Sequence, residues 1–406
     1  MLKLLNRLSN MPRELKIFAG ASLVMGIAYS VYDSTFNNFL NDRFALSGTQ
    51  RTFLELPREM PGVLVIFVSA IFWFLCSRRL GAWALILGGV GAILIGFASP
   101  GYYVMLLWLF IYSLGQHIFM PLASSIGMEL AAEGKDGQRL GQLNALRNFA
   151  AIGGSFLVFL GFRYLNFTYQ VTFILTAVGL TLAGLLMFMM KPAQPQKAGI
   201  YLKPHREYRL YYILAVLYGT RKQLFITFAP WVLVTIFKEP TSTLATLITI
   251  GGVVGILFQP LLGWMIDRFG ERAVLVAEAI LLAFVCVGYG YARSFFPPLT
   301  AFLVVCVCYL VDQMLMSVNM ARATYMKKIA LRKEDVQPAL TLGTSLDHVV
   351  SITIALLSGL IWDRFGYQYV FLMGAGIALI NLVAALQIKL PRRAAPAPAP
   401  EAAAEG

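Results

Sequence analysis

Gly263-Trp264-Met265-Ile266-Asp267-Arg268-Phe269-Gly270-Glu271-Arg272 is a short polar segment between two long apolar runs, 243–266 and 273–292. The hydrocarbon core of a bilayer is about 30 Å thick, and a helix needs roughly 20 apolar residues to cross it. Both runs are long enough, so the segment is predicted to be a tight loop between two membrane-spanning helices.

Ten further runs of this kind fill the chain, which is 58% hydrophobic and only 13% charged. The runs are continuous, whereas the strands of a membrane barrel alternate apolar and polar residues. We therefore predict an all-α membrane protein with 12 transmembrane helices. The predicted spans are 17–40, 51–76, 83–99, 102–128, 141–162, 168–190, 209–236, 243–266, 273–292, 298–324, 338–361 and 368–389.

Lysine and arginine are distributed unequally between the two sides of the membrane. With the N-terminus inside, the cytoplasmic segments hold 22 of them and the outer loops hold 6. This bias predicts that both termini lie in the cytoplasm. The very short loops and the absence of a large extra domain favour a bacterial plasma (inner) membrane protein. The net charge of +13 then belongs to short loops that face lipid headgroups, so we expect membrane lipid and no nucleic acid as a partner.

The longest polar interval, about 191–208, divides the spans six and six. An offset of 189 residues aligns Tyr29 with Tyr218 and Gly62 with Gly251 in the two halves, which favours a duplication. We predict an N-terminal six-helix bundle over 1–190, a cytoplasmic linker over 191–208, and a C-terminal six-helix bundle over 209–390. The Ala/Pro-rich tail 391–406 is predicted to be disordered.

Two six-span repeats with Gly-x-x-x-Asp-Arg-x-Gly-x-Arg between spans 8 and 9 resemble the major facilitator superfamily over about 15–390. The resemblance implies a secondary transporter with the MFS fold, two pseudo-symmetric six-helix bundles around a central cavity. The family's copy of this motif between spans 2 and 3 departs here, because Arg78 stands where the acid is expected. The span-5 signature of the drug/proton antiporters and the sugar-porter signatures are not apparent.

The motif loop is the predicted gate. Asp267 can accept hydrogen bonds from the free N–H groups of a helix N-terminus and pair with a loop arginine, Arg268 or Arg272. Gly263 permits close helix contact, and Gly270 permits a tight turn. Such a latch can be made in one conformation and broken in another. The alternative is a plain acid that caps a helix.

Charged residues inside spans point to the substrate site. Each costs roughly 2.5–3.5 kcal/mol at mid-membrane, yet span 7 carries Arg221 and Lys222 in succession. Asp312, Asp347 and His348 on other spans could neutralise them when no substrate is present. The resemblance implies that spans 1, 4, 7 and 10 line the cavity, and polar residues fall on all four. The candidate substrate-binding residues are Tyr32, Asn37, Gln116, His117, Arg147, Tyr218, Arg221, Lys222, Asp312, Gln313, Asp347 and His348.

Taken alone, Gln116, Gln313 or a tyrosine could instead form an interhelical hydrogen bond, and His117 could be a satisfied core histidine. For Arg221 and Lys222 the alternative is placement in a loop. Asp33, Arg58 and Glu59 are the candidate proton-coupling residues, because carboxylates at membrane depth beside an arginine can exchange partners with a proton. The alternative is an ion-pair network that ties spans 1 and 2. Glu278 is interpreted as structural, and Arg322 is expected to extend its charge toward the membrane surface.

The sequence shows no metal-ligand spacing of His and Glu, no nucleophile elbow and no phosphate loop. We therefore expect no enzyme activity, cofactor or metal, and we predict a monomeric secondary carrier that works by alternating access. Its substrate is predicted to be a small organic anion or zwitterionic metabolite, moved by proton-coupled symport. Proton-driven efflux of drugs or lipid-like compounds is the first alternative, and a non-transporting membrane sensor or scaffold is the second.

Overall fold

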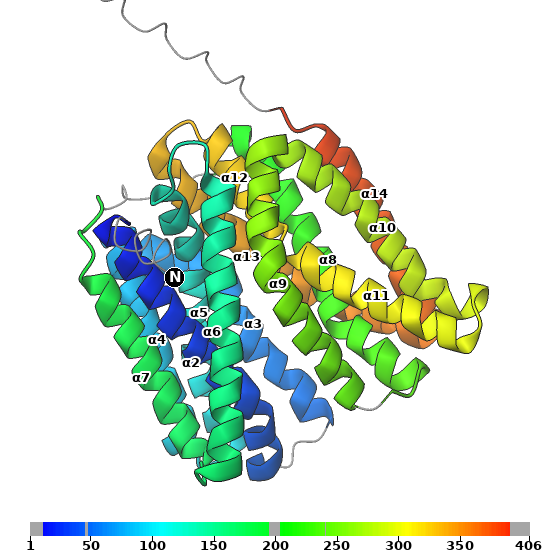
Figure 1. The fold of residues 1–406 in the computed structure, drawn as a ribbon, viewed down its shortest axis with the longest axis horizontal. Coiled ribbons are helices and arrows are strands. Elements are labelled where there is room, and N and C mark those ends of the chain that lie inside the picture. Colours follow the sequence, from blue (N-terminus) through cyan, green and yellow to red (C-terminus); the bar gives the residue numbers. More distant parts are fainter. Residues whose placement is uncertain (1–10, 45–47, 195–203, 240, 390–406) are drawn as a thin grey trace, which may run out of the picture.

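The computed structural model describes residues 11–44, 48–194, 204–239 and 241–389. Over these ranges the chain folds into long helices joined by short connections (Figure 1). The six helices of the first half are α2 (Arg13–Phe44), α3 (Gly48–Ile71), α4 (Ser77–Phe97), α5 (Tyr102–Glu129), α6 (Asp136–Tyr164) and α7 (Tyr169–Phe188).

The second half contains α8 (Arg209–Trp231), α9 (Thr241–Phe269), α10 (Glu271–Phe295), α11 (Pro298–Met316), α12 (Asn319–Ile329), α13 (Val336–Phe365) and α14 (Tyr367–Leu386). Short helical turns, η2 (Arg206–Tyr208) and η4 (Lys333–Asp335), precede α8 and α13, and a π-helical turn, η3 (Val232–Ile236), extends α8. Since α11 and α12 together form one span, these helices make 12 transmembrane segments. The predicted fold class, two six-helix bundles, is confirmed.

Ten of the described helical segments are long and apolar enough, by composition alone, to cross a membrane. Helices α3 and α8 are not among these ten. Both carry charge within the span: Glu55, Arg58 and Glu59 on α3, and Arg221 and Lys222 on α8. Glu59, Arg221 and Lys222 contact side chains of other helices, whereas Arg58 pairs with Glu55 on its own helix.

Each half has its own apolar core, and an aromatic stack lies in each. In the first core Tyr32 stacks on Tyr112, with ring centroids 4.0 Å apart. In the second, Tyr289 stacks on Phe371 at 4.9 Å. The limits predicted for the two halves stay predictions, and most of the predicted linker and the tail lie outside the described residues.

The end of the molecule at which α2 begins and α14 ends is called the inner end here, after the predicted orientation, and the opposite end is the outer end. Figure 1 shows the first half, α2 to α7, on one side and the second half on the other. Helix α6 packs along α9, and α3 packs along α13. These two helix pairs form most of the contact between the bundles.

Two differences from the predicted spans change the course of the chain, while other spans differ only in where their ends fall. The predicted helix 298–324 is interrupted at Ser317 and Val318, where a turn separates α11 from α12. At this break the carbonyl of Met316 accepts a hydrogen bond from the Tyr218 hydroxyl at 3.2 Å, which joins α11 to α8. Helix α3 ends at Ile71 rather than at 76, because the chain turns there to begin α4 at Ser77.

Candidate functional site

Two adjacent cavities lie among the helices that face the bundle interface. The larger, of about 610 Å³, is bordered by α2, α5 and α6, with Ile248 of α9 on the far side. The smaller, of about 290 Å³, is bordered by helices of both halves, α2, α5, α6, α8, α11, α12 and α13. Met120 and Arg147 belong to the walls of both. Together the two cavities have the size of a site for a small molecule.

Arg147 occupies the junction of the two cavities. Its guanidinium donates to the side-chain oxygen of Asn144, one turn earlier on α6. Among the described residues no carboxylate lies within ion-pair distance of Arg147. The junction therefore presents a positive charge that no described acid neutralises.

Helix α2 turns two different faces to its surroundings. Asp33 lies in the wall of the larger cavity with Tyr29, and Gln116 of α5 shares this wall. Tyr32 points the other way, into the first core, where it packs between Phe36 and Tyr112. Asn37 is exposed and forms no part of either wall. The predicted single polar face of α2 is thus divided between a cavity and a core.

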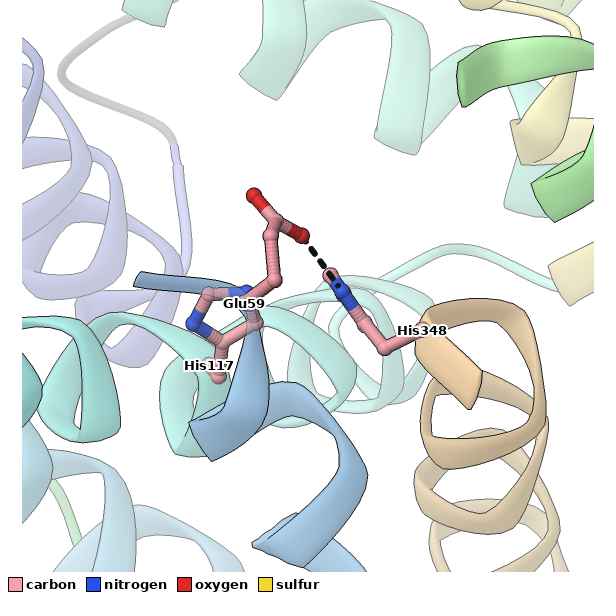
Figure 2. Close-up of side chains that lie close together, drawn as sticks. All are labelled: Glu59, His117 and His348. Carbon is pink, nitrogen blue, oxygen red and sulfur yellow. Dashed lines mark hydrogen bonds and ion pairs between the residues drawn. The ribbon is translucent and has the colours of Figure 1, made fainter. Parts of the chain in front are cut away.

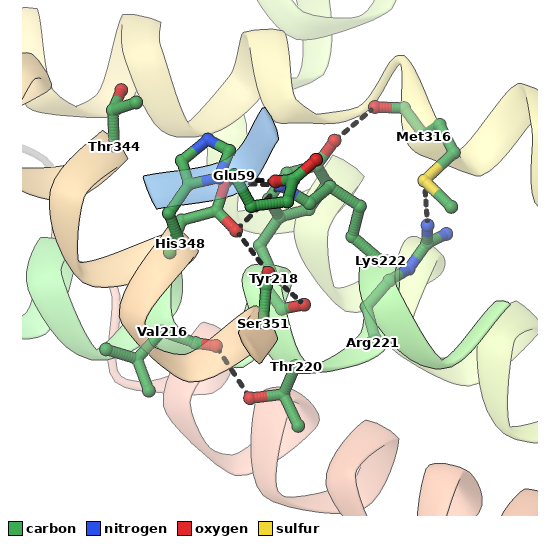
Figure 3. A network of polar contacts seen from close by, with 12 residues as sticks. Glu59, Val216, Tyr218, Thr220, Arg221, Lys222, Met316, Thr344, His348 and Ser351 are labelled. Carbon is green, nitrogen blue, oxygen red and sulfur yellow. Dashed lines mark hydrogen bonds and ion pairs between the residues drawn. The ribbon is translucent and has the colours of Figure 1, made fainter. Parts of the chain in front are cut away.

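Lys222 of α8 borders the smaller cavity and forms an ion pair with Asp347 of α13 at 2.9 Å. Asp347 also accepts a hydrogen bond from Ser351, and Tyr218 borders the same cavity. Figure 3 shows Tyr218, Lys222 and Ser351 in one network of polar contacts. Arg221, the neighbour of Lys222, is only 2% exposed and pairs with Asp312 of α11 at 3.2 Å. The predicted neutralisation of Arg221 and Lys222 by acids on other spans is confirmed.

Arg221 lies outside both cavity walls, and its guanidinium also contacts the Met316 sulfur at 2.8 Å. The structure therefore places Lys222, and not Arg221, beside the cavities. Gln313, on the same helix as Asp312, lies near Gly251 of α9 rather than in a cavity wall.

A second buried pair joins Arg322 of α12 to Glu278 of α10. The two guanidinium nitrogens lie 2.8 and 3.3 Å from the carboxylate oxygens, and the guanidinium also donates to the carbonyl of Leu214 at 3.2 Å. The expectation that Arg322 extends toward the membrane surface is wrong. A bidentate acid partner inside the bundle satisfies its charge there.

The predicted cluster of Asp33, Arg58 and Glu59 is distributed over three environments. Arg58 pairs with Glu55 at 3.4 Å and is half exposed. Glu59 turns to the other bundle, where its carboxylate lies 2.8 Å from Nδ1 of His348 on α13. His117 of α5 packs edge-on against His348, with ring centroids 4.5 Å apart (Figure 2). Glu59, His117 and His348 form a group of their own.

At the inner end, Asp267 crosses from one bundle to the other. Its two carboxylate oxygens accept hydrogen bonds from the backbone N–H groups of Gly137 and Gln138, at 2.9 and 2.7 Å. These N–H groups belong to the first turn of α6, so Asp267 caps a helix of the opposite bundle and not its own neighbour α10. The prediction that it binds a helix N-terminus is confirmed, and the contact joins the two halves.

The glycines of the motif have the predicted roles. A Cβ at Gly263 would collide with the carbonyl of Gly137, so α9 and α6 approach closely here. Gly270 has a φ of +84° in the turn to α10. The predicted pairing of Asp267 with a loop arginine is wrong. Arg268 and Arg272 are exposed and in no ion pair with it, because both carboxylate oxygens are held by α6.

Lys327 of α12 supplies a second connection across the inner end. Its ammonium lies 2.6 Å from the carboxylate of Asp136 and 2.8 Å from the carbonyl of Met128. Neither Lys327 nor Asp136 stands out in the sequence as a residue that connects the bundles. The only signal was an acid at the first position of a helix, where it is common for reasons of capping alone.

Arg78, which replaces the expected acid in the first half, stays within its own bundle. It donates to Glu14 at 2.9 Å, to Glu129 at 2.6 Å and to the carbonyl of Lys191 at 2.8 Å. These contacts fasten α2, α5 and the end of α7 to the start of α4. The two loops therefore have different roles: the second-half loop connects the bundles, and Arg78 consolidates one of them.

This architecture, two six-helix bundles around polar cavities with a closed inner end, is that of a polytopic membrane carrier. The family model described as Major Facilitator Superfamily matches residues 211–405. The second half of the chain thus matches the major facilitator superfamily, and the fold of the described residues is the one that transporters of this superfamily have.

Solved structures match over nearly the whole chain. FucP, a Major Facilitator Superfamily transporter in the outward conformation, superposes with a TM-score of 0.74 at 16% identity, over 91% of this chain and 97% of that one. A bacterial homologue of the iron transporter ferroportin, in an outward-facing state, gives 0.73 at 12%, over 92% and 99%. The proton:xylose symporter XylE gives 0.66 at 14%, over 91% and 94%. No curated protein sequence matches the chain.

Proposed function

We propose that this chain is a proton-coupled symporter of a small organic anion or zwitterion, working by alternating access in a bacterial inner membrane. The observation that carries the proposal is the position of Arg147 at the junction of the two cavities, with Asn144 and no described acid as its partner. An arginine in a membrane interior is costly unless an anion pairs with it. A carboxylate or phosphate on the substrate supplies that anion with bidentate geometry.

Asp33 supports the coupling part of the proposal. It borders the larger cavity, as Arg147 does, and it appears in no described ion pair. An acid that faces a water-accessible cavity can take up a proton in one conformation and release it in another. A substrate carboxylate on Arg147 leaves Asp33 free for a proton or for the amine of a zwitterion. FucP and XylE are both named as proton symporters.

The larger cavity also favours this substrate class over the efflux of lipid-like compounds. Its wall includes several hydrogen-bonding side chains besides Arg147 and Asp33. These are Tyr29, Ser30, Ser34, Gln116, Asn148 and Ser155. Ser30, Ser34 and Ser155 bond to one another and to the carbonyl of Ala151. An apolar compound would still bury polar groups such as Gln116 and Asn148 without offering them a partner, which costs free energy for each one. A small polar metabolite can satisfy them.

The orientation proposed is with both termini in the cytoplasm, since the basic loops gather at the inner end. In that orientation Asp267 and Lys327 close the cytoplasmic side, and the substrate would enter from outside. We propose that one chain suffices for transport, because both cavities are built from a single copy.

The test compares Arg147→Gln with Arg147→Lys. A panel of carboxylates, phosphates and amino acids is first screened for thermal stabilisation of the purified protein. Binding of the best ligand should then fall at least tenfold in Arg147→Gln and remain in part in Arg147→Lys, which keeps the charge but loses the planar fork. Arg163→Gln is the matched control, an exposed arginine on the same helix. Equal affinity in a well-folded Arg147→Gln protein would remove Arg147 from the site.

A further inference from the structure

Glu59, His117 and His348 bring three metal-ligand side chains together at the interface of the two bundles. Each offers one donor atom, and these three atoms lie within 4.8 Å of one another. Figure 2 shows the side chains converging from α3, α5 and α13. We propose that these three residues bind a transition-metal dication, and that this ion joins α13 to the first bundle.

The chemistry of the three residues fits such an ion. Two imidazoles and one carboxylate form the ligand set that borderline metals such as Zn²⁺ and Co²⁺ accept, with a fourth position open to water or a ligand. Donor atoms around zinc at ~2.0–2.1 Å lie about 3.3 Å from one another. The donor atoms here need to close by on the order of 1 Å, which small rotations of the side chains provide.

The hydrogen bonds around the histidines orient them as ligands. Nδ1 of His117 lies 2.8 Å from the carbonyl oxygen of Ser113, to which it can donate, so that Nε2 keeps its lone pair. A backbone carbonyl on one ring nitrogen is the usual way a metal-binding histidine is held. None of the described residues forms a hydrogen bond with Nε2 of His348, although His348 is only 3% exposed. A ring nitrogen buried in this way is costly in an apolar interior unless something binds it.

Helix α3 is shaped to receive His348. A Cβ at Gly62 would collide with the imidazole of His348, and Gly62 lies on the same face of α3 as Glu59, three residues earlier. The imidazole therefore sits against bare backbone, beside the carboxylate that it contacts. Lys222, the cation in the same network (Figure 3), is paired with Asp347. Because Lys222 is paired with Asp347, the carboxylate of Glu59 is available to bind the metal ion.

This site is independent of the proposed transport substrate, because none of its three residues lies in the wall of either cavity. Its position gives it a mechanical effect. Glu59 and His117 belong to the first bundle and His348 to the second, so an ion bound to all three holds α3 and α13 together at this depth. The imidazole nitrogens that bind the metal must carry no proton, so metal binding is weaker at low pH.

The experiment uses the metal-stripped full chain, purified without a histidine tag. Titration with Zn²⁺ should show one ion per chain, and Co²⁺ should give visible absorption from a nitrogen- and oxygen-liganded ion. His348→Ala and His117→Ala should each weaken Zn²⁺ binding at least tenfold. Glu59→Gln, which keeps the shape of the side chain, should do the same. His205→Ala is the matched control, because it removes the remaining histidine, which lies outside the cluster.

The change in melting temperature on adding Zn²⁺ separates a lost site from a lost fold. Wild type and His205→Ala should both be stabilised by Zn²⁺, whereas the three cluster variants should melt cooperatively at a temperature that Zn²⁺ does not change. The proposal is overturned if wild type binds no Zn²⁺, or if the His348→Ala and His117→Ala proteins bind it as tightly as wild type does. Neither result depends on the identity of the transported substrate.

Discussion

Asp267 caps the first turn of a helix in the opposite bundle, with one carboxylate oxygen 2.9 Å from the backbone nitrogen of Gly137. The other oxygen is held by the next N–H group, that of Gln138. One side chain thus satisfies two N–H groups that a helix leaves without partners, and in doing so it joins the two halves of the carrier.

Replacing Asp267 with Asn should weaken the closed inner end. The amide has one oxygen to offer two N–H groups, and it lacks the charge that interacts favourably with the start of α6. A loss of about 1–3 kcal/mol would raise the population with an open inner end severalfold or more. Distances between spin labels at Glu133 and Lys333 should lengthen.

Asp363→Asn is the control for this measurement. Asp363-Arg364-Phe365-Gly366 repeats the order of Asp267-Arg268-Phe269-Gly270 but lies at the other end of the second bundle. Unchanged label distances in Asp267→Asn, or equal changes in both variants, would reduce Asp267 to an ordinary cap.

Gly263→Ala should open the same gate through packing rather than charge. The added methyl group would meet the carbonyl of Gly137, and backbone cannot rotate away as a side chain can. Helices α9 and α6 must then move apart at the inner end. Gly252→Ala on the same helix has open space for its methyl group and should leave the label distances as in wild type. Identical distances in the two variants would argue against close packing as part of the gate.

Arg221→Ala should destabilise the second bundle rather than remove a substrate contact. It leaves Asp312 buried and without its cation, which costs about 3–5 kcal/mol in comparable cases. The apparent melting temperature should fall, while Arg221→Met combined with Asp312→Leu should recover most of the loss because no charge is then left unpaired. If Arg221→Ala melts as wild type does but loses ligand stabilisation, Arg221 belongs to the substrate site after all.

Asp33→Asn should separate proton coupling from substrate movement. The amide cannot carry a proton between conformations, so proteoliposomes should lose accumulation driven by a pH gradient but keep exchange of substrate across the membrane. Asp42→Asn is the control, an acid on the same helix that accepts a hydrogen bond from Tyr169. Accumulation that still follows the pH gradient in Asp33→Asn would exclude this residue as the coupling acid.

The sequence predicted the spans well because membrane thickness sets a minimum apolar length, and each run could be tested against it. It also predicted that Arg221 and Lys222 would meet acids, since unpaired charge in lipid is costly. It did not reveal the break between α11 and α12. The apolar pattern continues through Ser317 and Val318, and the turn depends on contacts that α11 makes with other helices.

Contacts between the bundles were the least predictable part of the site. Glu59 and His348 are 289 residues apart, and their meeting depends on how α3 packs on α13. Asp33, Arg58 and Glu59 are close in sequence and in depth, yet the rotation of each helix turns them to different neighbours. Sequence spacing fixes the face of one helix but not the partner that this face meets.

The position of each polar contact relative to water determines whether it can be exchanged during a transport cycle. When Asp267 leaves α6 at the inner surface, water can bind both the carboxylate and the freed N–H groups, so opening leaves no group unsatisfied. Arg221 and Asp312 have no such replacement, because both are buried between helices and lie in neither cavity wall. The contacts at the surface can therefore be broken and formed again. The buried ion pair in the interior stays formed, so the second bundle can move as a rigid body.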